Sequence, residues 1–186
     1  MTKTAIVIGA TGLVGAELVR QLLESPHYSR VTALLRRPID QQHPKFHQEI
    51  LDFDHPDPAL LQGDDLYCAI GSTLAKAGSR EAQYKIDCLY PYEIARIARA
   101  NGMRRFLLVS SVGANAGSSN FYLRTKGESW RRKSSRWNSK PLFLPGRLFC
   151  WASDRNFGGE NASPWLCRSF FAQLPLKNTG GYRALR

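Results

Sequence analysis

The sequence predicts an α/β protein in which helices cover both faces of a parallel β-sheet. Short apolar, β-branched runs alternate with segments whose apolar residues recur at helical spacing, as strand–helix–strand units require. A glycine-rich turn at residues 9–15 joins the first strand to its helix, and the alternation continues to about residue 128. At 186 residues the chain is long enough for one domain with a substantial core.

Five strands are expected in this region, with helices between them. The strands cover residues 4–8, 30–35, 46–51, 65–70 and 105–110. A helix is expected over residues 13–24, where Leu and Val recur three and four positions apart. A second helix is expected over residues 81–100, with Asn101 and Gly102 as its end, and a last one begins near Phe121.

The glycine-rich turn has the chemistry of a diphosphate site. Glycine lets backbone N–H groups approach an anion, and the helix start adds unpaired donors and the positive end of its dipole. The turn therefore predicts dinucleotide binding on a doubly wound sheet of the Rossmann type, although an ordinary glycine bend is the alternative. The candidate cofactor-binding residues of the turn are Gly9, Thr11, Gly12, Leu13, Val14 and Gly15.

Residues that follow the next three strands indicate which dinucleotide is bound. Arg36 follows the second strand, where an acidic residue would hydrogen-bond the ribose 2′-hydroxyl of NAD and an arginine accommodates the 2′-phosphate of NADP. We therefore expect NADP in preference to NAD. Asp52 and Gly71 follow the third and fourth strands and are placed to line the adenine side of the site.

A Tyr-x-x-x-Lys spacing, Tyr122 to Lys126, begins the last expected helix. Residues four apart share one helix face, and a nearby ammonium lowers the pKa of a phenol, which makes it a usable general acid/base. Ser111 ends the fifth strand, at the edge where open α/β sheets bind ligands, and is placed to orient a substrate carbonyl. These three are the candidate catalytic residues, with simple turn chemistry as the alternative for the serine.

These segments resemble a known family, the atypical short-chain dehydrogenase/reductases related to the Tat-interacting oxidoreductase-like protein. Besides the glycine turn, the resemblance rests on residues 68–80, 106–114 and 118–128, and it covers about two-thirds of the chain. It implies that the glycines, Arg36 and Asp52 contact NAD(P).

The resemblance further implies that Ser111, Tyr122 and Lys126 form a reductase triad for hydride transfer to or from a carbonyl or alcohol. Some members of the family act chiefly as regulators that bind partner proteins. A cofactor-gated binding module without turnover and a nucleotide-sugar epimerase-like enzyme are therefore the alternatives.

Composition indicates the cellular compartment of the protein and the kinds of partner it binds. Hydrophobic residues make up 43% and charged residues 22%, as in soluble globular proteins, and no run approaches the roughly 18 apolar residues of a membrane span. Four cysteines without a Cys-x-x-Cys pair indicate thiols in a reducing compartment. We expect a cytoplasmic protein with a small-molecule substrate, no metal site and no membrane association.

Charge divides the chain near residue 128. Residues 1–128 hold 15 Lys or Arg and 13 Asp or Glu, a net charge of +2. Residues 129–186 hold 11 Lys or Arg and two Asp or Glu, a net charge of +9. All four tryptophans lie in the second part, where hydrophobic periodicity fades. We therefore expect an NAD(P)-binding domain over residues 1–128, followed by a basic segment, rich in Trp, Ser and Arg, over residues 129–186.

A shift of the reading frame just after Glu128 is our interpretation of this break. With a suitable choice among the permitted codons, the neighbouring frame of residues 142–153 can spell the Arg-Pro and Leu-x-Gly pattern that the family has there. A disordered tail and a nucleic-acid-binding tail are the alternatives, and we do not expect nucleic acid as a partner. Loss of the family's sixth strand predicts an unpaired, aggregation-prone sheet edge and weakened or lost activity.

Overall fold

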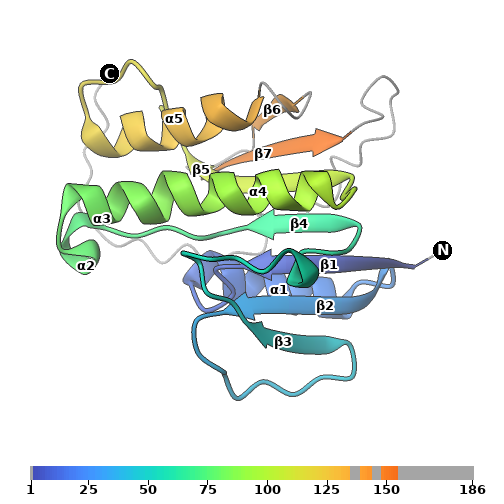
Figure 1. The fold of residues 1–186 in the computed structure, drawn as a ribbon. Helices are drawn as coiled ribbons and strands as arrows, with labels where there is room; N and C mark the ends of the chain where they lie inside the picture. The colour runs from blue at the N-terminus through green and yellow to red at the C-terminus, as the bar shows by residue number, and fades with distance from the viewer. Residues whose placement is uncertain (1, 135–138, 144–147, 155–186) are drawn as a thin grey trace.

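The structure is a computed structural model that describes residues 2–134, 139–143 and 148–154. One β-sheet forms its centre, in the strand order β3-β2-β1-β4-β5-β7-β6 (Figure 1). The first five strands are β1 (Lys3–Ile8), β2 (Tyr28–Leu35), β3 (Phe46–Ile50), β4 (Asp65–Cys68) and β5 (Arg105–Ser111). They pair with one another in parallel, which confirms the parallel α/β sheet expected from the sequence.

The far edge of the sheet differs from the expectation. β7 (Leu148–Asp154) pairs antiparallel with β5 over its whole length, and β6 (Ser139–Phe143) pairs antiparallel with β7. The expectation of an unpaired β5 edge is therefore wrong, because the basic segment itself supplies two strands. Residues 135–138, 144–147 and 155–186 of that segment lie outside the described residues.

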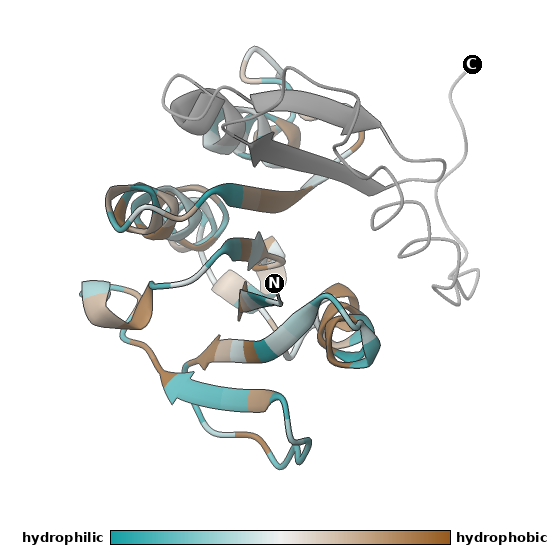
Figure 2. Cartoon of the chain, turned by 90° about the vertical axis from the view of Figure 1, so that its right-hand side faces the viewer, coloured by the Kyte–Doolittle hydropathy of each residue, from teal (hydrophilic) through white to brown (hydrophobic). Residues whose placement is uncertain are grey.

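Helices cover both faces of the sheet. α1 (Leu13–Glu24) lies on one face and α4 (Tyr90–Ala100) on the other, as the end-on view in Figure 2 shows. α5 (Phe121–Ser134) packs beside α4 and continues beyond Glu128. The shorter helices are η1 (Pro58–Leu60), α2 (Leu74–Ala77) and α3 (Arg80–Tyr84). This two-sided arrangement confirms the doubly wound fold.

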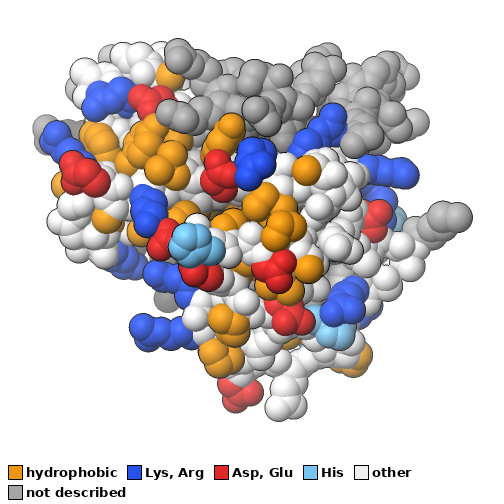
Figure 3. Space-filling model, viewed as in Figure 1, with side chains coloured by type: hydrophobic (Ala, Val, Ile, Leu, Met, Phe, Trp, Pro, Cys, Tyr) orange, Lys and Arg blue, Asp and Glu red, His pale blue; other side chains and the backbone are white. Residues whose placement is uncertain are grey.

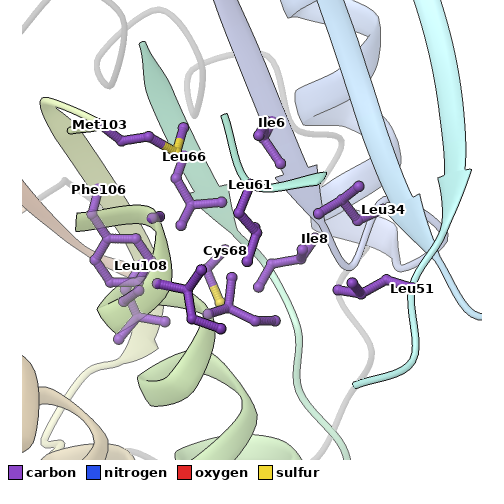
Figure 4. Packing of buried hydrophobic residues seen from close by; sticks show 14 of the residues in the cluster. Ile6, Ile8, Leu34, Leu51, Leu61, Leu66, Cys68, Met103, Phe106 and Leu108 are labelled. Atoms are coloured by element: carbon purple, nitrogen blue, oxygen red, sulfur yellow. The ribbon is translucent and has the colours of Figure 1, made fainter. Parts of the chain in front are cut away.

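Two apolar clusters hold the helices to the sheet. Ile6 and Ile8 of β1 pack with Ile94 of α4 in one cluster, whose strand residues Figure 4 shows side by side. Val7 points to the opposite face and packs with Leu22 of α1 in the other cluster. Because neighbouring residues of β1 alternate between two buried clusters, both faces of this strand are covered, as in the centre of a parallel sheet.

One helical segment departs from the sequence prediction. Residues 81–100, expected as a single helix, divide into α3, a π-helical turn at Lys85–Leu89 and α4. Pro91 accounts for the wide turn, because it has no N–H for the carbonyl of Asp87 and its ring would crowd that carbonyl in a regular α-helix. Asp87 lies within the turn and is 1% exposed. The π-turn therefore carries a buried carboxylate.

The surface over α4 carries charges of both signs, interspersed in Figure 3. Lys85 Nζ lies 2.6 Å from Asp54 Oδ1, and Arg96 Nε lies 2.8 Å from Glu93 Oε2. Among the described residues, no helix combines the length and apolar character needed to cross a membrane. Over the same ranges, no three His, Cys, Asp or Glu side chains gather as a metal ion would require.

Candidate functional site

The glycine turn lies at the switch point of the sheet. It follows β1, from which the chain winds outward to β2 and β3 before crossing to β4 on the other side. Gly9 adopts a φ of +84°, and a Cβ at this position would lie 2.5 Å from the carbonyl carbon of Ala69, just after β4. A Cβ on Gly15 would lie 1.9 Å from the carbonyl oxygen of Gly9. Only glycines allow the turn, the first turn of α1 and the end of β4 to pack this closely.

The start of α1 is open to solvent. Gly12 is the N-cap residue, its carbonyl accepts the N–H of Ala16 at 2.8 Å, and no acidic residue lies in the first helical turn. The first N–H groups of any α-helix lack an acceptor within the helix. Thr11 and Gly12 are exposed, and Leu13 is 82% exposed. The helix start therefore presents unneutralised donors at the surface, where an anion can bind.

Three more of the expected cofactor residues lie at the same edge. Arg36 directly follows β2, and Asp52 and Gly71 lie in the loops that follow β3 and β4. The carboxyl ends of these strands meet at one edge because the strands are parallel. All three are exposed. Asp52 accepts the N–H of Asp54 at 2.8 Å, which fixes the loop after β3. The structure thus brings the expected cofactor residues together along the carboxyl edge of the sheet.

Lys126 makes a buried ion pair that the sequence did not predict. Its Nζ lies 2.6 Å from Asp87 Oδ1, and the two side chains are only 6% and 0% exposed. The N–H of Ser72 donates to the same carboxylate at 3.3 Å and 3.4 Å. A Cβ on Gly71 would lie 3.0 Å from Asp87 Oδ1 and 3.2 Å from Lys126 Nζ. The ion pair therefore lies directly beneath the exposed loop that follows β4.

Tyr122 and Lys126 share one face of α5. The Lys126 ammonium lies 5.9 Å from the centre of the Tyr122 ring, and Tyr122 is 38% exposed. Ser111 is half-buried, and its Oγ donates to the carbonyl of Val112 at 3.4 Å. Tyr122 and Lys126 are thus brought together, whereas the hydrogen bond of Ser111 in this structure goes to its neighbour in the chain.

A signal for Asp87 was present in the sequence. The apolar face of α4 includes Ile94, and the helical repeat carries that face back to positions 83 and 87, which hold Gln83 and Asp87. Polar residues at core positions require partners, because burying an unpaired charge or amide is costly. Gln83 Nε2 donates to the carbonyl of Ser72 at 3.1 Å, so both residues hold the loop after β4.

A glycine turn and an open helix start at the switch point of a doubly wound sheet define a dinucleotide-binding protein of the Rossmann type. Residues 9–139 match the family described as NAD(P)H-binding, and the chain belongs to this family.

Individual relatives agree with this assignment. Protein HTATIP2 of Rattus norvegicus is 33% identical over 187 residues, which cover 97% of this chain and 75% of the rat protein. The mitochondrial protein FMP52 of Debaryomyces hansenii is 37% identical over 131 residues, 67% of this chain and 57% of its own length. The resemblance to the atypical short-chain dehydrogenase/reductases is therefore confirmed, although this chain spans little more than half of the fungal relative.

The fold also occurs in a solved structure. MoeE5 in complex with UDP-glucose and NAD superposes with a TM-score of 0.60 over 71% of this chain and 48% of MoeE5. The two sequences are 17% identical, so the similarity is one of fold.

Proposed function

We propose that this protein is an NADP-dependent oxidoreductase that transfers a hydride to or from the carbonyl or alcohol carbon of a small molecule. The observation that carries the proposal is the open N-terminus of α1 behind the tightly packed Gly9–Gly15 contact. Arg36 lies on the β2 side of this turn, and Tyr122 and Lys126 follow β5 on the other side. The site therefore has anion-binding groups and proton-transfer groups at opposite ends of one sheet edge.

Each residue has a distinct role in this proposal. The backbone of the glycine turn would hold the diphosphate, Arg36 the 2′-phosphate and Lys126 the nicotinamide ribose, while the bound cofactor supplies the hydride. In the reductive direction, the Tyr122 hydroxyl gives its proton to the carbonyl oxygen as the carbonyl carbon becomes an alcohol. Ser111 orients that oxygen by a hydrogen bond. The partial exposure of Tyr122 leaves its phenol accessible to a substrate.

The NADP preference is supported by the position of Arg36, exposed and directly after β2. A fluorescence titration with NADPH and NADH tests it, and we expect NADPH to bind at least about tenfold more tightly because the guanidinium pairs with the 2′-phosphate. Arg36→Ala should remove this difference by weakening NADPH alone. Arg30→Ala, which removes an exposed arginine within β2, is the matched control. Equal affinity for the two cofactors in the unmodified protein contradicts the preference.

Turnover tests the enzymatic part of the proposal. NADPH consumption is followed by absorbance with a panel of aldehydes and ketones. Reduction of at least one class of carbonyl supports an oxidoreductase. Tight NADPH binding with no turnover across the panel favours a cofactor-gated protein-binding module, and conversion of a nucleotide sugar without net NADPH consumption favours an epimerase.

The proposals on the reading frame and on the cellular location need tests that do not involve the cofactor site. A frame shift after Glu128 is supported by the abrupt change of charge at that residue, and the nucleotide sequence across codon 128 tests it. If no neighbouring frame encodes the Arg-Pro and Leu-x-Gly pattern, the shift did not occur. A cytoplasmic location predicts a diffuse fluorescent fusion, and a mitochondrial pattern, as the name of the fungal relative FMP52 suggests for that protein, would overturn it.

A further inference from the structure

We propose that Asp87 is a positioning residue that fixes the Lys126 ammonium beneath Gly71 and cancels its charge. Lys126 then serves the site as a held hydrogen-bond donor and not as an unopposed positive charge beside Tyr122. This inference rests on the proposed function, because it concerns two residues to which that function assigns roles.

The first observation is the closeness and burial of the pair. A separation of 2.6 Å between Lys126 Nζ and Asp87 Oδ1 is that of a charge-assisted hydrogen bond. Both side chains are almost entirely withdrawn from water. A charge buried in this way is stable only when it is paired, so each partner depends on the other.

The second observation is that Asp87 is held independently of Lys126. The N–H of Ser72 donates to its carboxylate, and Gln83 anchors the carbonyl of the same serine. The π-turn at Lys85–Leu89 carries the carboxylate toward this loop. Asp87 is therefore fixed by two elements, and it determines where the flexible lysine side chain ends.

The third observation is the room left above the pair. Gly71 is exposed, and even a Cβ at this position would approach both charged atoms to within 3.2 Å. The absence of a side chain at Gly71 brings the paired ammonium to just beneath the surface of the carboxyl edge. We therefore expect a ribose hydroxyl to approach the ammonium past Gly71.

The field at Tyr122 follows from this arrangement. A positive charge 5.9 Å from the Tyr122 ring stabilises a phenolate, and a carboxylate 2.6 Å from that charge opposes this effect.

Three other charged residues on α3 and α5 have contacts of their own. Glu128 of α5 accepts the hydroxyl of Tyr84 of α3 at 2.8 Å. The guanidinium groups of Arg80 and Arg124 lie 5.5 Å and 5.8 Å from the centre of the Phe121 ring. Within the described residues, the acid paired with Lys126 is Asp87.

The pKa of Tyr122, measured without cofactor or substrate, tests the proposal. Phenolate absorbance is recorded after a rapid pH jump, and the signal of the matching Tyr122→Phe protein is subtracted. Asp87→Asn leaves the ammonium unopposed and should lower the pKa of Tyr122 by about one unit. Asp54→Asn removes an acid from the exposed pair with Lys85 and should leave that pKa unchanged. An unchanged Tyr122 pKa in Asp87→Asn would overturn the proposal.

A double variant keeps the test valid if Asp87→Asn does not fold. Asp87→Asn combined with Lys126→Met replaces a buried ion pair by neutral groups, which proteins tolerate far better than the loss of one partner. If Asp87 cancels the charge of Lys126, the pKa of Tyr122 stays at its original value in this double variant. A rise of about one unit would show that Lys126 acts on Tyr122 as an unopposed charge, contrary to the proposal. NADPH titration of the same proteins reports separately on the proposed function.

Discussion

Gly15 packs against the backbone of Gly9 so closely that a Cβ on Gly15 would lie 1.9 Å from the Gly9 carbonyl oxygen. This contact fixes the first turn of α1 against the loop that leaves β1. Gly12, between these two residues, is different. Its φ is −78°, and the nearest atom to an added Cβ is 3.5 Å away, an ordinary contact distance. Gly9 and Gly15 are thus required by packing, and Gly12 is the position where a side chain can be added without a clash.

Gly15→Ala should destabilise the protein. The added methyl group must push α1 away from the Gly9 turn, and overpacking of this kind costs about 1–3 kcal/mol of unfolding free energy. Gly12→Ala is the matched control and should cost about 1 kcal/mol or less, because alanine is only a poorer N-cap residue. Urea denaturation of both variants measures the difference. Equal stabilities would show that the close packing at Gly15 relaxes without cost.

Tyr28 should make stability depend on pH in the alkaline range. Its hydroxyl donates to Asp65 Oδ2 at 2.5 Å and lies 2.7 Å from the Tyr67 hydroxyl. Burial, followed by the nearby charges, raises the pKa of Tyr28 well above its usual value. The folded state therefore keeps this proton where an unfolded tyrosine loses it near pH 10. The stabilisation of the folded state by this proton is fully present below about pH 10 and is lost as the pH rises toward the pKa of the folded-state Tyr28.

Tyr28→Phe tests this dependence. At pH 8 the variant should lose about 1–3 kcal/mol of unfolding free energy, because the buried Asp65 loses a donor. The difference in unfolding free energy between the two proteins should become smaller as the pH rises from about 9 to 11. Only the unmodified protein has the Tyr28 proton, so only this protein loses the stability linked to it. Tyr92→Phe, at a half-buried tyrosine, serves as the control. A gap that stays constant over this range contradicts the account.

Replacement by alanine should change stability at Ser110 and turnover at Ser111. Ser110 Oγ is buried and has no hydrogen-bond partner within the described ranges, so Ser110→Ala removes an unsatisfied group and should raise the unfolding free energy by up to about 1 kcal/mol. Ser111→Ala should leave stability nearly unchanged and lower kcat at least about tenfold, since it removes a donor to the substrate oxygen. Loss of turnover in Ser110→Ala with normal turnover in Ser111→Ala would move the catalytic assignment to Ser110.

Tyr122→Phe should abolish turnover and leave NADPH affinity within about twofold. Phenylalanine keeps the ring over Lys126 but has no proton to give, so only proton transfer is lost. Steady-state rates and a parallel NADPH titration measure the two effects. Turnover that survives the substitution would remove Tyr122 from the mechanism.

The sequence predicts elements whose signals are local. The helix predicted over residues 13–24 agrees with α1, Leu13–Glu24, because an apolar repeat marks its buried face and a glycine turn marks its start. The predicted bounds of the five parallel strands agree with the structure to within two residues at each end. Most of these strands are apolar runs bounded by turn residues, whereas β3, Phe46–Ile50, is mixed in polarity. The candidate site residues follow from the same strand ends and share one edge of the sheet.

Features that depend on contacts between distant segments were missed. The π-turn arises because Pro91 has no N–H to donate within the helix. The spacing of apolar residues around Pro91 is helical, and this spacing contains no information about a missing N–H. The Asp87–Lys126 pair joins residues 39 positions apart, on two helices whose packing only the fold determines. The pairing of β7 with β5 was missed because hydrophobic periodicity fades after residue 128.

Binding of NADPH to Gly12→Asp and Gly12→Ser tests the central claim most directly. A Cβ can be added at this position without a clash, and aspartate and serine are both good N-cap residues, so the two proteins should melt at similar temperatures. Only aspartate puts a negative charge on the open start of α1. If that helix start holds the diphosphate, Gly12→Asp should bind NADPH at least about a hundredfold more weakly than Gly12→Ser. Equal affinities in two folded variants would contradict a dinucleotide site at this turn.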